Sequence, residues 1–316
     1  MRNSWLAVMK ARALAVGVAF TLLAVSSNSG ARAADDVVFG TVPIAGTAAA
    51  WVGKDAGYFE EAGINLEIAN AVQFANIVAD VMAGTYQFGT VSVGTAAQAI
   101  IEGLPIKIVA NTYHSAGEQR LMALSSGPIK TIADLKGKHI GLGGLNNNFQ
   151  AGIIAQMKEA GVDTSTVTFT LISPPDLPAS LRNGVVEAAQ INEPGIVGAG
   201  DEFTAVIREP FKPFGENPCN NYVIVRADWA EQNKELVERF LTAYNKGAEL
   251  AATDKGAVIK AVMSFSEIPE KTLQAMTMPG FGSDLRKESF EATIQGMYDL
   301  GFLKRIVTVE EAFWAP

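Results

Sequence analysis

Short β-rich runs that alternate with amphipathic helical stretches restrict the fold of this chain more than any other feature of its sequence. We expect strands at residues 37–42, 65–68, 88–93, 106–110, 121–124, 138–140, 167–171, 185–191, 203–207 and 222–225. Apolar residues recur at helical spacing between them, at residues 47–62, 75–82, 95–101, 149–160 and 176–182, with a short helical turn at 132–135. This alternation predicts an α/β fold with mostly parallel sheets, each covered by helices on both faces.

The pattern starts again near residue 121, so we expect a second sheet rather than one long one. From residue 228 onwards the spacing of apolar residues is almost wholly helical. A chain of 316 residues is long enough for two lobes of ordinary size. The sequence therefore predicts two α/β lobes.

Residues 140–161, with the sequence IGLGGLNNNFQAGIIAQMKEAG, are where we expect the chain to hold a ligand. A glycine-rich turn follows an apolar run, and Asn146, Asn147 and Asn148 stand where a helix begins. Asparagine is a favoured N-cap, and the remaining amides at a helix N-terminus attract anions and hydrogen-bond acceptors. A cap accounts for one asparagine of the three, so we expect at least one of them to contact a ligand.

The composition excludes several classes of protein. Hydrophobic residues make up 48% of the chain and charged residues 18%, which is typical of a folded domain and not of a disordered one. The formal net charge of −8 argues against a nucleic-acid partner, which would require a basic face.

Residues 1–33 have the pattern of a secretory signal peptide. Basic residues precede the apolar run at 13–25, and Ala31 and Ala33 form an A-x-A cleavage site. The apolar run is shorter than the roughly 20 residues that a membrane span needs. We therefore expect cleavage after Ala33 and an exported, periplasmic protein.

Cys219 is the single cysteine, so the chain has no intrachain disulfide, and no cysteine at the cleavage site can carry a lipid. We expect Cys219 to be a packed bystander rather than a nucleophile, and the protein to be a soluble monomer.

Four segments of the chain are similar to one known family. They are GTVPIAGTAAAWVGKDAGYFEEAGINLEI at 40–68, MAGTYQFGTVSVG at 82–94, IADLKGKHIGL at 132–142 and LRNGVVEAAQINEPG at 181–195. In this order they resemble periplasmic solute-binding proteins of ABC importers, of the nitrate, sulfonate, taurine and thiamine-precursor (pyrimidine) family. The resemblance covers nearly all of the chain after residue 33.

The resemblance implies a two-lobe, type II periplasmic binding protein fold of the Venus-flytrap kind. Lobe one would comprise residues 34–115 and 222–316, and lobe two residues 116–221. Two hinge crossings, near residues 115–120 and 221–225, would let the lobes close on a small-molecule ligand. The protein would deliver that ligand to the permease and ATPase of an ABC transporter in the inner membrane.

The side chains that we expect around the ligand lie near the carboxyl ends of the predicted strands, where open α/β sheets bind ligands. They are Thr47, Trp51, Phe74, Ser92, Asn111, Tyr113, Asn146, Asn147, Asn148, Phe149 and Glu193. Hydroxyls at such positions either donate to a ligand or cap a turn, and aromatic rings either stack on a ligand or fill the core. His114 is either a hinge-side ligand contact or a solvated loop histidine.

Glu193 is the most specific of these candidates. A carboxylate at a strand end, beside Pro194, can accept a hydrogen bond from an amine or a ring N–H of a ligand, or it can form a hinge-side ion pair. The candidate loops hold no Lys or Arg, which favours a neutral, zwitterionic or singly charged ligand. We expect a sulfonate- or taurine-like solute first, because it would suit the helix N-terminus and the hydroxyls and because the resembling family is broad in such ligands. A pyrimidine or similar heteroaromatic, which would suit Glu193, Phe74 and Phe149, is the alternative.

Three other functions remain alternatives. An enzyme of thiamine-pyrimidine synthesis can have the same fold, but the sequence has no catalytic His/Cys cluster, no metal-ligand spacing and no cofactor motif, so we expect no catalytic residues. A nucleotide-binding domain is disfavoured because Asn146 stands at the third glycine position of the dinucleotide motif. A sensor that reports its ligand to a receptor has the same sequence features as a transport protein.

Overall fold

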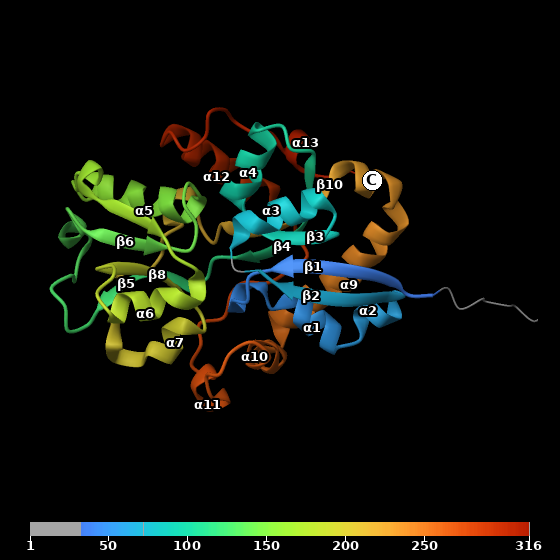
Figure 1. Ribbon diagram of the computed structural model, residues 1–316, viewed down its shortest axis with the longest axis horizontal. Helices are drawn as coiled ribbons and strands as arrows, with labels where there is room; N and C mark the ends of the chain where they lie inside the picture. The colour runs from blue at the N-terminus through green and yellow to red at the C-terminus, as the bar shows by residue number, and fades with distance from the viewer. Residues whose placement is uncertain (1–32, 72, 316) are drawn as a thin grey trace, which may run out of the picture. The chain divides into compact units, whose positions relative to one another are not determined.

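The computed structural model describes residues 33–71 and 73–315, and within them two five-stranded sheets form the framework (Figure 1). The first sheet has the order β2 (Ile64–Asn70), β1 (Asp35–Thr41), β3 (Phe88–Ser92), β10 (Cys219–Arg226) and β4 (Ile106–His114). The second has the order β7 (Thr168–Leu171), β6 (His139–Leu142), β8 (Ala188–Asn192), β5 (Gln119–Leu124) and β9 (Phe203–Ile207). The predicted leader lies outside the described residues apart from Ala33.

Each sheet contains one strand that runs against the others. β10 is antiparallel to β3 and β4, and β5 is antiparallel to β8 and β9. The remaining strands of each sheet share one direction, so the prediction of mostly parallel sheets is confirmed. Because these strands share a direction, their carboxyl ends lie at one edge of each sheet, which is where α/β proteins bind ligands.

Helices flank both sheets. Around the first sheet they are α1 (Ala49–Asp55), α2 (Tyr58–Glu61), α3 (Phe74–Ala83), α4 (Val93–Ile101), α8 (Ala227–Gln232), α9 (Lys234–Thr253), α10 (Lys255–Met263), α12 (Lys287–Asp299) and α13 (Val309–Ala312). The second sheet has α5 (Asn148–Glu159) on one face and α6 (Leu177–Arg182) and α7 (Gly195–Ala199) on the other (Figure 1). The short helix α11 (Glu270–Leu273) packs against α10 and against α7 of the second sheet. Short 3-10 turns are η1 (Ala45–Thr47), η2 (Ile132–Leu135), η3 (Thr164–Thr166), η4 (Pro174–Asp176), η5 (Gly200–Glu202) and η6 (Lys212–Phe214).

Aromatic packing holds α9 against the first sheet. The ring of Phe240 stacks on that of Phe88 with 3.7 Å between centroids, and Phe39 and Tyr244 lie beside it. All four side chains are fully buried. Burial of one such ring contributes about 1.5–3 kcal/mol, so this cluster anchors the C-terminal helices to the sheet.

The predicted single helix at residues 47–62 is wrong, because the chain there forms η1, α1 and α2. Gly57 adopts φ +79°, a left-handed conformation that L-residues rarely adopt, and it separates α1 from α2. Two strands also extend further than expected, since β4 continues to His114 and β10 begins at Cys219.

Two segments connect the sheets, and we call them the first crossing (residues 115–118) and the second crossing (residues 208–218). The first joins β4 to β5, and the second joins β9 to β10. Residues 221–225, where we expected a hinge, lie inside β10 and pair with β3 and β4. The sequence did not indicate that β10 begins at Cys219, because no β-rich run marks this position.

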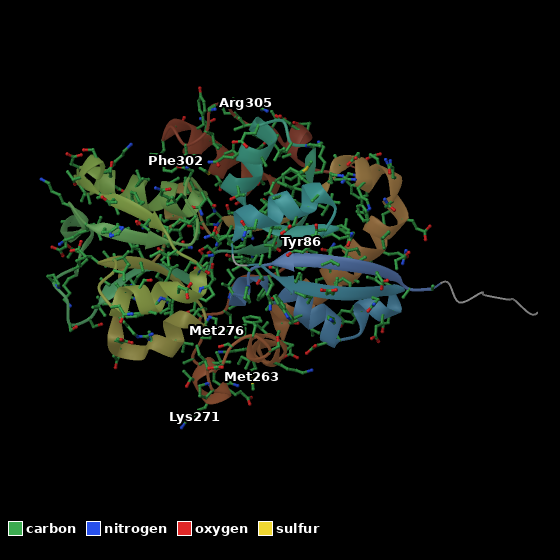
Figure 2. The ribbon with its side chains drawn as sticks, viewed as in Figure 1. Tyr86, Met263, Lys271, Met276, Phe302 and Arg305 are labelled. Atoms are coloured by element: carbon green, nitrogen blue, oxygen red, sulfur yellow. The ribbon has the colours of Figure 1, made fainter. Side chains whose placement is uncertain are left out.

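A third segment, residues 264–280, also contacts elements of the second sheet. Ile268 lies so close to Gly198 of α7 that a Cβ on this glycine would be 2.5 Å from its Cδ1 atom. Met276 is 3% exposed, whereas Lys271 of α11 points into solvent (Figure 2). Among the described residues, no helix is both long and apolar enough to cross a membrane.

Candidate functional site

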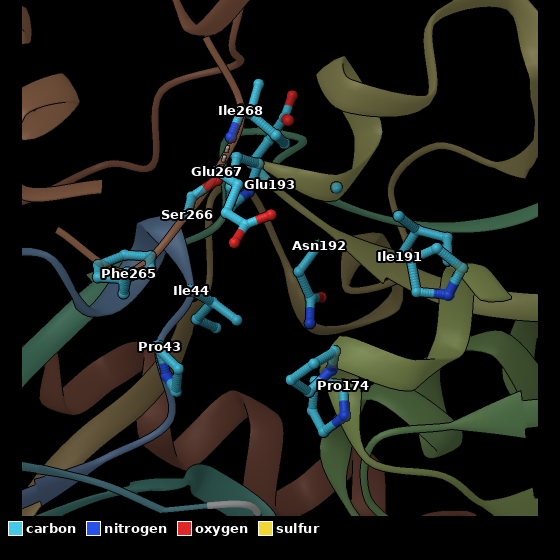
Figure 3. A pocket seen from close by; sticks show the side chains of 14 residues that line it. Pro43, Ile44, Pro174, Ile191, Asn192, Glu193, Phe265, Ser266, Glu267 and Ile268 are labelled. Carbon is cyan, nitrogen blue, oxygen red and sulfur yellow. Dashed lines mark hydrogen bonds between the residues drawn. The ribbon is translucent and has the colours of Figure 1, made fainter. Parts of the chain in front are cut away.

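A cavity of about 440 Å³ lies beside the loops that follow β1, β7 and β8 (Figure 3). Residues after α10 complete its wall. The lining consists of Pro43, Ile44, Pro174, Pro175, Pro178, Ile191, Asn192, Glu193, Pro194, Gly195, Phe265, Ser266, Glu267 and Ile268. Loops of both sheets and the C-terminal segment therefore meet at one site.

The wall of this cavity is mostly apolar and poor in donors. Five of its residues are prolines, which have no backbone N–H, and three isoleucines and Phe265 add further apolar side chains. Asn192, Glu193, Ser266 and Glu267 bring its polar side chains, and no Lys, Arg or His is among the lining residues. Such a site suits an apolar body with few polar groups, and it has no cationic partner for an anion.

Asn192 is the last residue of β8, and its amide is the neutral polar group best placed for a ligand. Its Oδ1 atom accepts a hydrogen bond from Gln190 Nε2 at 3.4 Å. Its side chain points into the space between Ile44 and Pro174 (Figure 3). The Nδ2 group is therefore available as a donor to a bound molecule.

Glu193, the most specific candidate from the sequence, lines the cavity but is only 2% exposed. Its Oε2 accepts from the Val197 amide at 2.9 Å, and its Oε1 accepts from the Thr277 amide at 3.0 Å. Burial raises the pKa of this carboxyl, and the two amide hydrogen bonds oppose that rise. The carbonyl oxygen of Glu193 accepts from the Ala45 amide at 3.0 Å, so this residue joins three segments of the chain.

Trp51 stands behind the cavity wall rather than on it. It is partly buried, and its ring lies 5.0 Å from that of Phe265, which faces the cavity. Trp51 therefore supports the cavity wall from behind through Phe265.

The hydroxyls of Thr47 and Ser92 are engaged by neighbouring backbone. Thr47 Oγ1 lies 2.7 Å from the Val42 carbonyl and 2.9 Å from that of Ile44, so it closes the loop after β1. Ser92 Oγ caps α4 by accepting from the Thr95 amide at 3.1 Å. In both cases the turn or cap alternative accounts for the side chain.

Asn111 and Tyr113 are buried in β4 beside β10. Asn111 Oδ1 accepts from the thiol of Cys219 at 3.0 Å, and the hydroxyl of Tyr113 is hydrogen-bonded to Gln119. Burial raises the pKa of Cys219 to about 12, so it remains an unreactive thiol, as a packed bystander would. His114 ends β4, where its ring packs on Gly280.

The three asparagines have three different surroundings. Asn146 is exposed, with φ +55°, and its carbonyl accepts from Gln98 Nε2 at 2.5 Å. Asn147 is the N-cap of α5, with its Oδ1 accepting from the Gln150 amide at 3.0 Å. Asn148 is buried, and its Nδ2 donates to the Asn220 carbonyl at 3.4 Å.

The start of α5 lies against the start of α4. A Cβ atom on Gly94 would be 2.9 Å from the Cα of Asn147 and 3.0 Å from the Asn148 amide nitrogen. Phe149 is buried, with its ring 5.7 Å from that of Phe211, and Phe74 is partly buried at the first residue of α3. None of these aromatic or asparagine side chains belongs to the cavity lining.

The structure also adds residues that the sequence did not indicate. Gln190 accepts from the Gly143 amide at 3.0 Å and donates to Gln119 Oε1 at 3.1 Å, which fixes the glycine-rich turn. The prolines at 174, 175 and 178 and residues 265–268 line the cavity. The cluster of prolines after a strand was the available signal, whereas residues 265–268 carried none.

Among the described residues, no group of three or more His, Cys, Asp and Glu side chains is placed to hold a metal ion. The geometry is that of a small-molecule cavity with neutral and acidic polar groups.

Comparison with solved structures identifies the fold. The alkanesulfonate-binding protein of Xanthomonas axonopodis pv. citri, solved with bound MOPS, is 16% identical with a TM-score of 0.75, over 88% of this chain and 98% of its own. The periplasmic nitrate-binding protein of Synechocystis PCC 6803 is 11% identical with a TM-score of 0.74, over 87% and 83%. A zinc-bound ligand-binding component of an ABC-type import system from Staphylococcus aureus is 14% identical with a TM-score of 0.75, over 89% and 96%.

These neighbours confirm the predicted two-domain α/β architecture of periplasmic binding proteins. No curated protein matches the sequence. The family model described as NMT1/THI5 like matches residues 45–257, which is more than half of the chain. The resemblance inferred from the four sequence segments is thereby confirmed, and the chain belongs to the NMT1/THI5-like family.

Proposed function

We propose that this protein is the periplasmic solute-binding component of an ABC importer, which captures a small organic solute in the cavity and delivers it to the permease. The observation that carries the proposal is the cavity itself. It lies at the carboxyl ends of strands, and loops from both sheets line it. In this reading the protein binds its solute without catalysis, and residues 1–33 direct its export.

The division into lobes is part of the proposal. Residues 34–115 and 222–316 form lobe one, and residues 116–221 form lobe two. Support comes from the sheets, since the second contains only strands between residues 119 and 207. Hinge motion at the two crossings then opens and closes the cavity.

The chemistry of the lining favours an uncharged or cationic solute with a flat, apolar body, such as a pyrimidine or related heteroaromatic. Phe265 and the prolines offer surfaces for a ring, and Asn192 offers an amide for a polar ring atom. Glu267 is exposed at the cavity, and no basic side chain lines it, so an anion lacks a charged partner there.

A sulfonate or taurine-like solute is the second candidate, and a different observation favours it. The first turns of α4 and α5 face each other at Gly94 and Asn147. Ser92 accepts from the Thr95 amide at the start of α4, and Asn147 accepts from the Gln150 amide at the start of α5. The amides of the preceding residues, Gly94 and Phe149, lie at the positive ends of these two helices. An oxyanion would bind there once the helices separate by the width of the group.

Calorimetric titration of the purified protein with pyrimidines, taurine, methanesulfonate and nitrate separates the two candidates. We expect a pyrimidine to bind, and Asn192→Ala to raise its Kd about tenfold, which corresponds to about 1.4 kcal/mol. Asn76→Ala, on the exposed part of α3, is the matched control and should leave Kd unchanged.

The second candidate would be established if the wild type bound a sulfonate but no pyrimidine. Gly94→Val should then abolish that binding, and Asn192→Ala should leave it unchanged. If none of these compounds bound, the proposed solute classes would be refuted.

A further inference from the structure

Glu118 lies in the first crossing, and its carboxyl connects the two crossings. The side chain is buried, with 2% of the residue exposed. Its Oε2 accepts from the Ala116 amide at 2.7 Å, within the same crossing. Its Oε1 accepts from Asn220 Nδ2 at 3.1 Å, and Asn220 lies in β10 directly after the second crossing.

Glu118 and Asn220 also accept hydrogen bonds from residues outside the two crossings. The Glu118 carbonyl accepts from the Glu193 amide at 2.9 Å, at the cavity. The Asn220 carbonyl accepts from Asn148 Nδ2 at 3.4 Å, at the start of α5. Hydrogen bonds therefore connect Glu118 and Asn220 to the loop that lines the cavity and to the helix start beside Gly94.

On balance the surroundings of Glu118 disfavour a negative charge. Burial is the main cause and the buried carboxyl of Glu193 adds to it, whereas hydrogen bonds from the amides of Ala116 and Glu118 and from the side chain of Asn220 favour the charged form. Arg120 is the nearby cation, and its guanidinium donates to the Gly117 carbonyl at 3.0 Å and to Thr277 Oγ1 at 3.1 Å, without an ion pair to Glu118. Burial raises the pKa of Glu118 to about 7.

Asn220 supplies a second, geometric observation. While its Nδ2 donates to Glu118, its Oδ1 is buried and has no hydrogen-bond partner among the described residues. Such an orphan acceptor is costly, and two buried O–H groups can donate to it: a protonated carboxyl of Glu118, which already accepts from the same amide, and the hydroxyl of Tyr113, which also interacts with the Asn220 side chain. The pair then resembles a carboxylic acid facing an amide, with one hydrogen bond in each direction.

We propose that Glu118 is a positioning residue of the hinge, which holds the two crossings together through Asn220 when it carries a proton and releases them when it loses that proton. In the protonated form the O–H of Glu118 satisfies Asn220 Oδ1, and no charge is buried. In the ionised form the carboxylate is stabilised by water, which reaches it only when the crossings separate. Closure on a solute then takes up one proton, a consequence that rests on the proposed function.

The test needs no solute and measures the hinge directly. Spin labels at Lys54→Cys in α1 and Glu159→Cys in α5 report the distance between the two proposed lobes, while buried Cys219 stays unlabelled. We expect a narrow distance distribution at about pH 6 and a broader, longer one at about pH 8.5, on either side of the carboxyl titration. Glu118→Gln keeps an acceptor and a donor without a charge, so its distribution should be narrow at both pH values.

Glu187→Gln, which alters an exposed pair with Lys138, should respond to pH as the wild type does. The proposal is overturned if the wild type shows no change with pH, or if Glu118→Gln changes as the wild type does. Should Glu118→Gln fail to fold, infrared difference spectra of Glu193→Gln, which lacks the other buried carboxyl of this region, decide between the same pH values. Loss of the carbonyl band of a buried carboxylic acid on raising the pH supports the proposal, and absence of that band at about pH 6 overturns it.

Discussion

Replacement of Glu193 by alanine should destabilise the protein through the loss of two backbone anchors. Its carboxyl accepts from the Val197 amide at 2.9 Å and the Thr277 amide at 3.0 Å, and the residue is 2% exposed. A buried amide left without an acceptor costs about 1–3 kcal/mol, and because these two amides are only partly buried we take about 1–2 kcal/mol for each, or about 2–4 kcal/mol together. Burial raises the pKa of Glu193, which means that the folded protein already destabilises its charged form, and removing that charge offsets part of the cost. We therefore expect the free energy of unfolding to fall by about 3 kcal/mol.

Urea unfolding followed by tryptophan fluorescence at about pH 7 measures this loss. Glu193→Gln keeps one acceptor oxygen, and its loss should lie between those of the wild type and Glu193→Ala. Glu187→Ala removes an exposed ion pair with Lys138 at 2.8 Å and an exposed hydrogen bond from the His139 amide at 3.2 Å, and should cost about 1 kcal/mol or less. The reasoning is refuted if Glu193→Ala costs no more than Glu187→Ala.

Further predictions concern Glu118, Gly152 and Cys219. Between about pH 4.5 and about pH 7 the folded protein keeps the Glu118 proton, whereas the unfolded chain releases it. The free energy of unfolding should therefore fall by about 3 kcal/mol over this range, relative to that of Glu118→Gln, and stay constant at higher pH. Urea unfolding at several pH values measures this fall. Gly152→Ala would place a Cβ atom 2.0 Å from the Pro210 carbonyl oxygen, so calorimetry should find a Tm several degrees lower than that of the wild type. The control Ala155→Gly, also in α5, should lower the free energy of unfolding by only about 1 kcal/mol. Burial raises the pKa of Cys219 to about 12, so iodoacetamide at about pH 8 should leave the folded protein unmodified and react only after unfolding, and equal rates would contradict its burial.

The sheets and most helices could be predicted because their signals are local. Alternating apolar residues and terminal glycines located β1 and α3, and the cap at Asn147 was recognisable from residue type alone. The break at Gly57 was missed because apolar spacing continues across it. The start of β10 was missed because its pairing with β4 depends on residues more than one hundred positions away.

The candidate site was predicted only in part, because its walls come from distant segments. Loop positions after β1 and β8 follow from strand direction, and Glu193 does line the cavity. Phe265 and its neighbours carry no sequence signal, since only the fold brings them to those loops. Glu118 was overlooked because a buried carboxyl in a connecting segment looks like any solvated acid until its burial is known.

Tryptophan fluorescence tests the central claim, that a solute binds in the cavity, most directly. Trp51 lies against Phe265 of the cavity wall, whereas Trp229 packs on Phe88 in the first sheet. Titration with the pyrimidine that binds should change the emission of the wild type and of Trp229→Phe, and leave that of Trp51→Phe unchanged at saturation. A change that persists in Trp51→Phe and disappears in Trp229→Phe would contradict binding at this cavity.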